Sequence, residues 1–158
     1  QQRRVDALTD THPIFARSRD RLRARHGTFS GILVDVFYDH FLSSGWRRYD
    51  DAPLPAFIQQ VHEAFASHSH LMPPAMRYPI EKLIEQDWLG SYATVEGIHM
   101  ALSRMSARLS HRFERTVRLE SAVEELIVHR DALAGDFATF YPLVQAACGV
   151  CLATDAQG

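Results

Sequence analysis

An apolar run in the first third of the chain restricts the fold more than any other feature. Residues 32–42 (ILVDVFYDHFL) carry three strongly polar side chains, those of Asp35, Asp39 and His40. A helix this apolar is expected to be buried, so all three groups are expected inside the fold. Because a buried, unpaired carboxylate costs several kcal/mol, the two aspartates require neutralisation by a cation, by protons or by arginines.

The spacing of these groups suggests how they are neutralised. Asp35 and Asp39 are four residues apart and therefore share one helix face. His40 lies one step round the helix and supplies an imidazole, which divalent transition metals favour beside carboxylates. The spacing alone leaves two interpretations open, a metal site and a buried salt-bridge network with arginines.

The hydrophobic periodicity predicts an all-α fold, because apolar residues recur every three or four positions and strand patterns are almost absent. With 158 residues and no composition shift or internal repeat, residues 1–158 are expected to form a single-domain helical bundle. The expected helices cover about residues 1–10, 13–25, 29–42, 54–68, 74–88, 95–109, 118–134 and 136–147. The expected buried stripe of helix 54–68 consists of Phe57, Ile58, Val61 and Phe65.

The charge is unevenly distributed along the chain. A net charge of −2 gives no basic excess for nucleic acid, and no apolar run approaches the length of a membrane span. Acidic residues gather at 120–125, whereas helix 13–25 carries Arg17, Arg19, Arg21, Arg23 and Arg25. Such a basic helix favours either an acidic partner or a solvated surface.

Cys148 and Cys151 lack a second pair for zinc and are expected to be free thiols in a reducing cytoplasm.

A second carboxylate pair near the N-terminus repeats the spacing of the first. Asp6 and Asp10 share a helix face, so two helices that each present a carboxylate pair could meet around one metal. Asp10 has an alternative role as the cap of the helix that begins at Pro13, and Asp6 could pair with Arg3 or Arg4.

The arginines of the sixth expected helix allow three interpretations. Arg104 and Arg108 follow one stripe of helix 95–109, and Arg112 continues this stripe just past its expected end; the three could bind phosphate, neutralise the aspartates or simply face solvent. His12 precedes a proline and is expected in an exposed turn.

A glycine-rich phosphate loop, a serine nucleophile elbow and a zinc-protease helix motif are absent from the sequence, which favours metal-assisted chemistry.

Three motifs together resemble the acyl carrier protein phosphodiesterase family. They are VDALTDTHP at residues 5–13, ILVDVFYDHFLSSGW at 32–46 and DFATFYP at 136–142, and the resemblance runs in order from residue 5 to about 143. It implies an all-α fold related to the HD-type metal-dependent phosphohydrolases. It also implies a phosphoric diester hydrolase that removes 4′-phosphopantetheine from a serine of holo acyl carrier protein, with manganese as the favoured metal.

The resemblance also implies roles for individual residues. The metal ligands it implies are Asp6, Asp10, Asp35, Asp39 and His40. The catalytic residues it implies are Asp39, His40 and Arg108. Asp39 would hold, with Asp6 and Asp35, the Mn²⁺ that supplies the attacking hydroxide, His40 would act as a ligand or proton donor, and Arg108 would steady the developing charge. The basic helix 13–25 is expected to receive the acidic surface of the carrier protein.

Two departures from the family pattern leave alternatives open. Gln2 stands where the family usually has a histidine, and the family has an N-terminal helical segment with a glycine-rich turn and a further aspartate that is expected to be missing here. If that segment supplies ligands, the chain is a helical bundle that binds acyl carrier protein without hydrolysing it. The other alternative is an HD-type hydrolase of a small phosphodiester.

Overall fold

The computed structural model describes residues 11–68, 70 and 87–155. Within these ranges the secondary structure consists of helices and no strand is present, which confirms the predicted all-α class. The chain divides into two compact units, residues 1–38 with 121–158 and residues 39–120. The single-domain expectation for residues 1–158 stays a prediction. None of the helices within the described ranges is long and apolar enough to cross a membrane.

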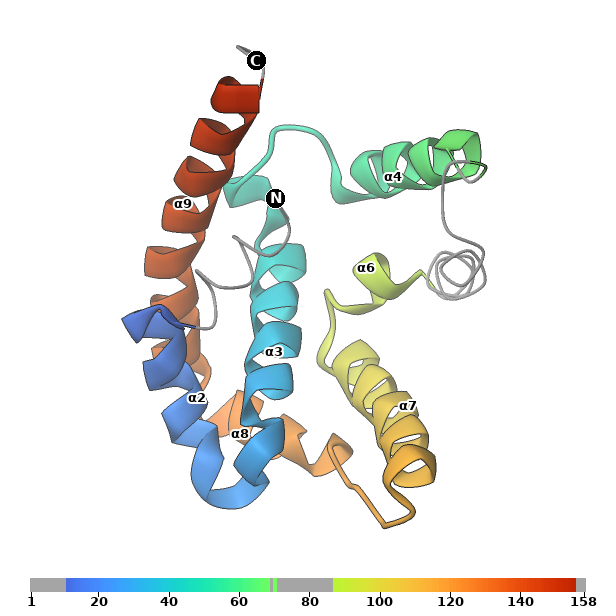
Figure 1. Cartoon of the computed structure of the whole chain (residues 1–158), viewed down its shortest axis with the longest axis vertical. Coiled ribbons are helices and arrows are strands. Elements are labelled where there is room, and N and C mark those ends of the chain that lie inside the picture. Colours follow the sequence, from blue (N-terminus) through green and yellow to red (C-terminus); the bar gives the residue numbers. More distant parts are fainter. Residues whose placement is uncertain (1–10, 69, 71–86, 156–158) are drawn as a thin grey trace. The chain divides into compact units, whose positions relative to one another are not determined.

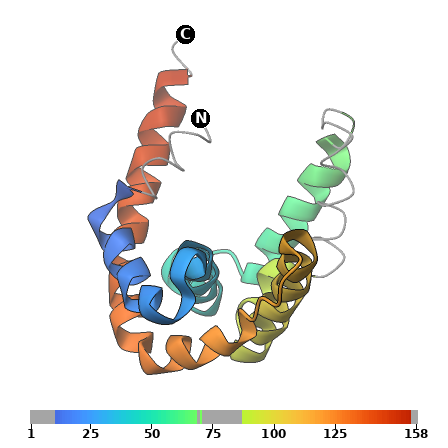
Figure 2. The same ribbon diagram turned by 60° about the horizontal axis from the view of Figure 1, so that its bottom comes forward.

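The first unit is built on a pair of helices that lie side by side (Figures 1 and 2). This pair consists of α2 (Pro13–His26) and α9 (Arg130–Asp155). The unit also contains η1 (Gly27–Phe29), the first part of α3 (Ser30–Ser44) and α8 (Val123–Val128).

Aromatic rings from three helices form the core of the first unit. The ring of Tyr38 lies 5.9 Å from that of Phe15, 5.3 Å from Phe137 and 5.8 Å from Phe140 between centroids. All four side chains are buried, and each is large, so together they supply a major part of the apolar area that this unit removes from water. The motif DFATFYP therefore contributes two residues to the core.

The ends of α2 follow local rules. Pro13 stands at the first helical position, and the Nδ1 atom of His12 accepts a hydrogen bond of 3.2 Å from the backbone N–H of Ile14. His12 is half-buried and its ring lies 5.1 Å from that of Phe140, so the prediction of an exposed turn was wrong. Gly27 ends the helix at a φ of +52°, which glycine adopts without strain.

The second unit contains the C-terminal part of α3 and helices on both sides of a gap in the described residues. Its elements are η2 (Trp46–Arg48), α4 (Leu54–His68), α6 (Trp88–Ser91) and α7 (Val95–Phe113), and η4 (Glu120–Ala122) begins at its last residue. The bounds of α4 agree with the prediction. Its predicted apolar stripe is only half-buried, however, because Phe57, Ile58, Val61 and Phe65 all keep partial exposure.

The helices that follow the gap differ in detail from the prediction. α7 is capped by the Thr94 hydroxyl, which accepts a bond of 3.0 Å from Gly97 N–H, and it continues four residues past Leu109 to Phe113. Asp87 accepts a bond of 3.2 Å from Gly90 N–H, so a short helix passes through Gly90, where an ending was predicted. The predicted helix 1–10 and residues 74–86 of the predicted helix 74–88 lie outside the described residues.

The largest error concerns the last two helices. The expected helix 118–134 is divided among η4, α8 and the first residues of α9, and the break falls at His129 rather than near Gly135. α9 then runs through both Gly135 and Pro142. Asp136, expected to begin a helix, lies inside α9 because its carboxylate binds side chains of α2 and is not used as a cap.

Candidate active site

Helix α3 carries the three polar groups that the sequence analysis singled out, but it exposes them to different degrees. Its buried stripe includes Leu33 and Phe37. Asp35 lies on the same side of the helix as Ile32, which is 38 % exposed, and Asp35 is itself exposed. The prediction that Asp35 is buried was therefore wrong. Asp39 is half-buried, and His40 is buried with 5 % exposure.

The imidazole of His40 is held by the backbone of a segment distant in sequence. Its Nδ1 atom lies 2.8 Å from the carbonyl oxygen of Tyr92. A carbonyl oxygen can only accept, so Nδ1 carries the proton of this bond. In the neutral ring Nε2 then carries the lone pair, and this is the tautomer that second-shell carbonyls impose on metal-ligating histidines.

Tyr92 interacts with the predicted site residues of the second unit, which are Asp39, His40 and Arg108. Its side chain is 6 % exposed, and burial raises the pKa of its hydroxyl. The carboxylate of Asp39 raises this pKa further, whereas the guanidinium of Arg108 lowers it. Asp39 and Arg108 therefore act on the hydroxyl of Tyr92, and His40 on its backbone carbonyl. The side chain remains a neutral phenol and a hydrogen-bond donor at physiological pH.

Arg108 reaches this group from the surface of α7. Arg104, Arg108 and Arg112 are all exposed, as expected if the side chains of this stripe face solvent. Sequence reasoning missed Tyr92, because it lies in the short connection between α6 and α7, where no helical periodicity or motif marks it.

The described residues do not form a metal site by themselves. Within residues 11–68, 70 and 87–155, no group of three or more His, Cys, Asp or Glu side chains is placed to hold an ion. Asp39 and His40 offer a carboxylate and an imidazole of the correct tautomer, which fit a divalent transition metal. Asp6 and Asp10, the other ligands that the resemblance implies, lie outside the described residues, as does Gln2.

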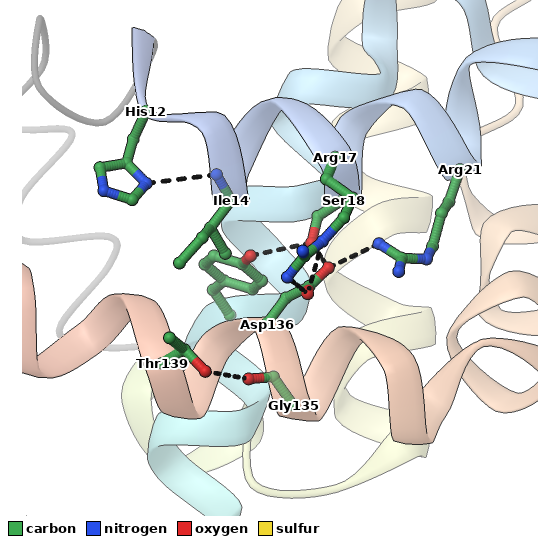
Figure 3. A network of polar contacts seen from close by, with 9 residues as sticks. His12, Ile14, Arg17, Ser18, Arg21, Gly135, Asp136 and Thr139 are labelled. Atoms are coloured by element: carbon green, nitrogen blue, oxygen red, sulfur yellow. Dashed lines mark hydrogen bonds and ion pairs between the residues drawn. The ribbon is translucent and has the colours of Figure 1, made fainter.

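A separate polar network lies in the first unit (Figure 3). Arg17 Nε and Ser18 Oγ donate to the carboxylate of Asp136 at 3.0 and 2.8 Å, and Arg21 forms an ion pair with the same carboxylate. The Ser18 hydroxyl also lies 2.9 Å from that of Tyr38. Burial raises the pKa of Asp136, but the bonds from Arg17 and Ser18 and the charge of Arg21 outweigh it, so the pKa lies below its usual value.

The C-terminal end of α2 pairs with the acidic stretch of α8. Arg25 Nη1 lies 2.6 Å from Glu125 Oε1 and 3.4 Å from Glu124 Oε2, and His26 Nε2 lies 3.1 Å from Glu125 Oε2. Burial raises the pKa of Glu125, but the contact with His26 and the charge of Arg25 lower it overall. The two charge clusters seen in the sequence therefore partly neutralise each other.

These features define an all-α protein with a partly buried carboxylate and imidazole group beside a tyrosine and an arginine. The model of the acyl carrier protein phosphodiesterase family matches residues 1–144. The chain belongs to this family, which confirms the resemblance and the prediction of an enzyme of the phosphoric diester hydrolase class.

Curated relatives agree with this assignment. A protein of Enterobacter sp. (strain 638) named acyl carrier protein phosphodiesterase is 33 % identical over 147 residues, which cover 91 % of this chain and 74 % of the relative. A protein of the same name from Salmonella agona is 32 % identical over 145 residues, with 91 % and 73 % covered. No solved structure matches the chain.

Proposed function

We propose that this chain hydrolyses the phosphodiester of holo acyl carrier protein, releasing 4′-phosphopantetheine and leaving the apo protein. The observation that carries the proposal is the match of the family over residues 1–144, together with relatives named for this activity over most of their length. We place the reaction in the cytoplasm, in keeping with the two expected free thiols. We also propose that the fold is a relative of the HD-type phosphohydrolases.

The residues around Tyr92 support a hydrolytic site. In the proposal His40, with its Nδ1 proton given to the Tyr92 carbonyl, offers the lone pair of Nε2 to a divalent cation. Asp39 supplies the neighbouring carboxylate, and exposed Asp35 lies one turn before it. Asp6 and Asp10 complete the proposed ligand set. Manganese is the proposed cation, and it would supply Lewis-acid activation of water and of a phosphoryl oxygen.

Two further groups of the same unit are suited to the charge that develops at phosphorus. The guanidinium of Arg108 is permanently charged and can pair with phosphoryl oxygens as they gain charge. The Tyr92 hydroxyl, whose pKa is raised by burial and by Asp39, keeps its proton and can donate it in a hydrogen bond. The proposal assigns catalytic roles to Asp39, His40 and Arg108, and a hydrogen-bonding role to Tyr92.

Docking of the carrier protein is proposed on α2. Arg17 and Arg21 share the single charge of Asp136, and Arg25 pairs with Glu124 and Glu125, so we assign the docking charge to Arg19 and Arg23. Because steering between exposed charges is screened by salt, reversing both charges should raise the KM for carrier protein more at low than at high ionic strength. If the doubly reversed variant had the same KM as the wild type at low salt, α2 would not be part of the docking surface.

Substitution at the α3 site tests the proposed chemistry. Asp39→Asn and His40→Gln should each lower kcat/KM for holo acyl carrier protein by about 100-fold or more and weaken Mn²⁺ binding, because each loses a ligand. Circular dichroism should show unchanged helicity. Asp51→Asn, an exposed aspartate of the same unit, is the matched control and should behave as the wild type. Full activity and Mn²⁺ affinity in Asp39→Asn would remove Asp39 from the site.

A further inference from the structure

The five arginines of α2 are not equivalent in the structure. Arg17, Arg21 and Arg25 each form an ion pair with a carboxylate of the first unit. Arg23 lies 3.9 Å from Asp20, and both side chains of that pair are more than 60 % exposed, so the interaction is weak. Among the described residues, Arg19 has no carboxylate within ion-pair distance, which sets Arg19 and Arg23 apart from the other three.

Arg19 also carries an unsatisfied polar atom. Its Nε is shielded from solvent and has no hydrogen-bond partner within the described parts of the chain. A buried donor without a partner is costly, and native proteins rarely keep one without a reason. The Nε and Nη2 edge of a guanidinium is the geometry that binds two oxygens of a phosphate or carboxylate at once. An oxyanion on this edge, reached by a rotation of the Arg19 side chain that opens Nε to the hollow, would satisfy the donor.

Arg19 and Arg23 line one open hollow of the first unit. It measures about 550 Å³, and its other lining residues are Gly27, Thr28 and Ser30. Arg19 and Arg23 are four residues apart, so they share a face of α2. Thr28 is exposed and brings a hydroxyl, whereas the Ser30 hydroxyl donates to the Gly27 carbonyl at 2.8 Å. None of the lining residues that the structure describes is acidic, so this part of the hollow is cationic.

We propose that this hollow is a binding site for a phosphate group, held by the guanidinium groups of Arg19 and Arg23 and by the Thr28 hydroxyl. Two fixed positive charges suit a dianionic phosphate better than a singly charged carboxylate. Phosphate monoesters and inorganic phosphate share this chemistry. The site lies within the first unit, and its existence does not depend on the proposed hydrolytic activity.

Titration of the full chain with inorganic phosphate at constant ionic strength tests this site directly. Binding should saturate and should shift the backbone amide NMR signals of Gly27 and Thr28. Arg19→Gln and Arg23→Gln should each weaken binding about 10-fold or more, and Thr28→Val about 3-fold to 10-fold. Arg130→Gln, which removes an exposed arginine elsewhere in the first unit, should bind phosphate as the wild type does. Arg19→Lys keeps the positive charge but loses the planar guanidinium that can bind two oxygens at once, so this variant should bind phosphate with intermediate affinity.

Other anions separate phosphate recognition from simple charge attraction. 4′-Phosphopantetheine should bind at least as tightly as inorganic phosphate, whereas pantetheine and acetate should not shift the same signals. The proposal is overturned if phosphate does not saturate, if Arg19→Gln binds it unchanged, or if acetate binds equally well. Docking of carrier protein is measured separately, as a KM in phosphate-free buffer, so either proposal can fail alone.

Discussion

Asp136 pairs with two arginines of α2 and so holds α2 against α9 by charge as well as by packing. Its carboxylate is buried, whereas the side chain of Arg17 is 58 % exposed and that of Arg21 is 28 % exposed. Exposed guanidinium groups can return to water at little cost, so the network is weaker than a fully buried ion pair. The Ser18 bond adds a buried neutral donor to the same carboxylate.

The lowered pKa of Asp136 makes this contribution dependent on pH. Because the folded-state pKa lies below that of an unfolded aspartate, about 3.9, the stabilisation is complete above that value and is lost as the pH falls through the folded-state pKa. Asp136→Asn should lower the free energy of unfolding by about 1–3 kcal/mol at pH 7, and the difference from wild type should shrink below about pH 4.

Urea unfolding at a series of pH values measures this difference. Asp20→Asn is the matched control, because Asp20 is 64 % exposed and its nearest arginine nitrogen is 3.9 Å away. It should change the free energy of unfolding by less than about 0.5 kcal/mol. A difference between Asp136→Asn and wild type that does not vary with pH would contradict the assigned role.

Single residues also show how far the sequence could predict the site. The burial of His40 followed from the apolar run around it, whereas Asp35 faces outward on a side that it shares with exposed Ile32. When the apolar run of a helix is longer than its buried stripe, the sequence alone does not show which of its polar residues faces solvent. Tyr92 was not predictable, because its position beside His40 depends on a contact across 52 residues of sequence.

At the scale of elements, local signals located the ends of α2 and α4 well. Pro13 and Gly27 fixed α2, and the predicted bounds of α4 agree with those of the structure. Local signals failed near Gly135, which normally indicates a helix end but here lies inside α9. Tertiary contacts of Asp136 and Phe137 outweigh the low helix propensity of glycine at that point.

Two glycines near the start of α3 allow a matched test of the turn that joins α2 to α3. Gly27 has a φ of +52°, so Gly27→Ala should lower the free energy of unfolding by about 1 kcal/mol or more. Gly31 is helical, and a Cβ there would meet no atom within 4 Å, so Gly31→Ala should be stabilising by about 0.5 kcal/mol. Thermal and urea unfolding measure both. Equal effects at the two positions would contradict the assigned strain.

At the scale of the whole molecule, the all-α class and the family were predictable, because both depend on patterns that are continuous in the sequence. The division into two compact units was not predictable, since no linker or change of composition marks residues 38–39 or 120–121. The network of Asp136 and the pairing of α2 with α8 could not be predicted from the sequence either, because each joins residues about 100 or more positions apart.

The central claim is that this chain removes the prosthetic group of acyl carrier protein in a metal-dependent reaction. Its most direct test is to incubate the chain with purified holo acyl carrier protein, with Mn²⁺ or with a chelator, and to record the intact mass of the carrier. The account predicts loss of the phosphopantetheine mass with Mn²⁺ and no loss with chelator. An unchanged mass with Mn²⁺, while the Enterobacter relative converts the same carrier, would contradict it.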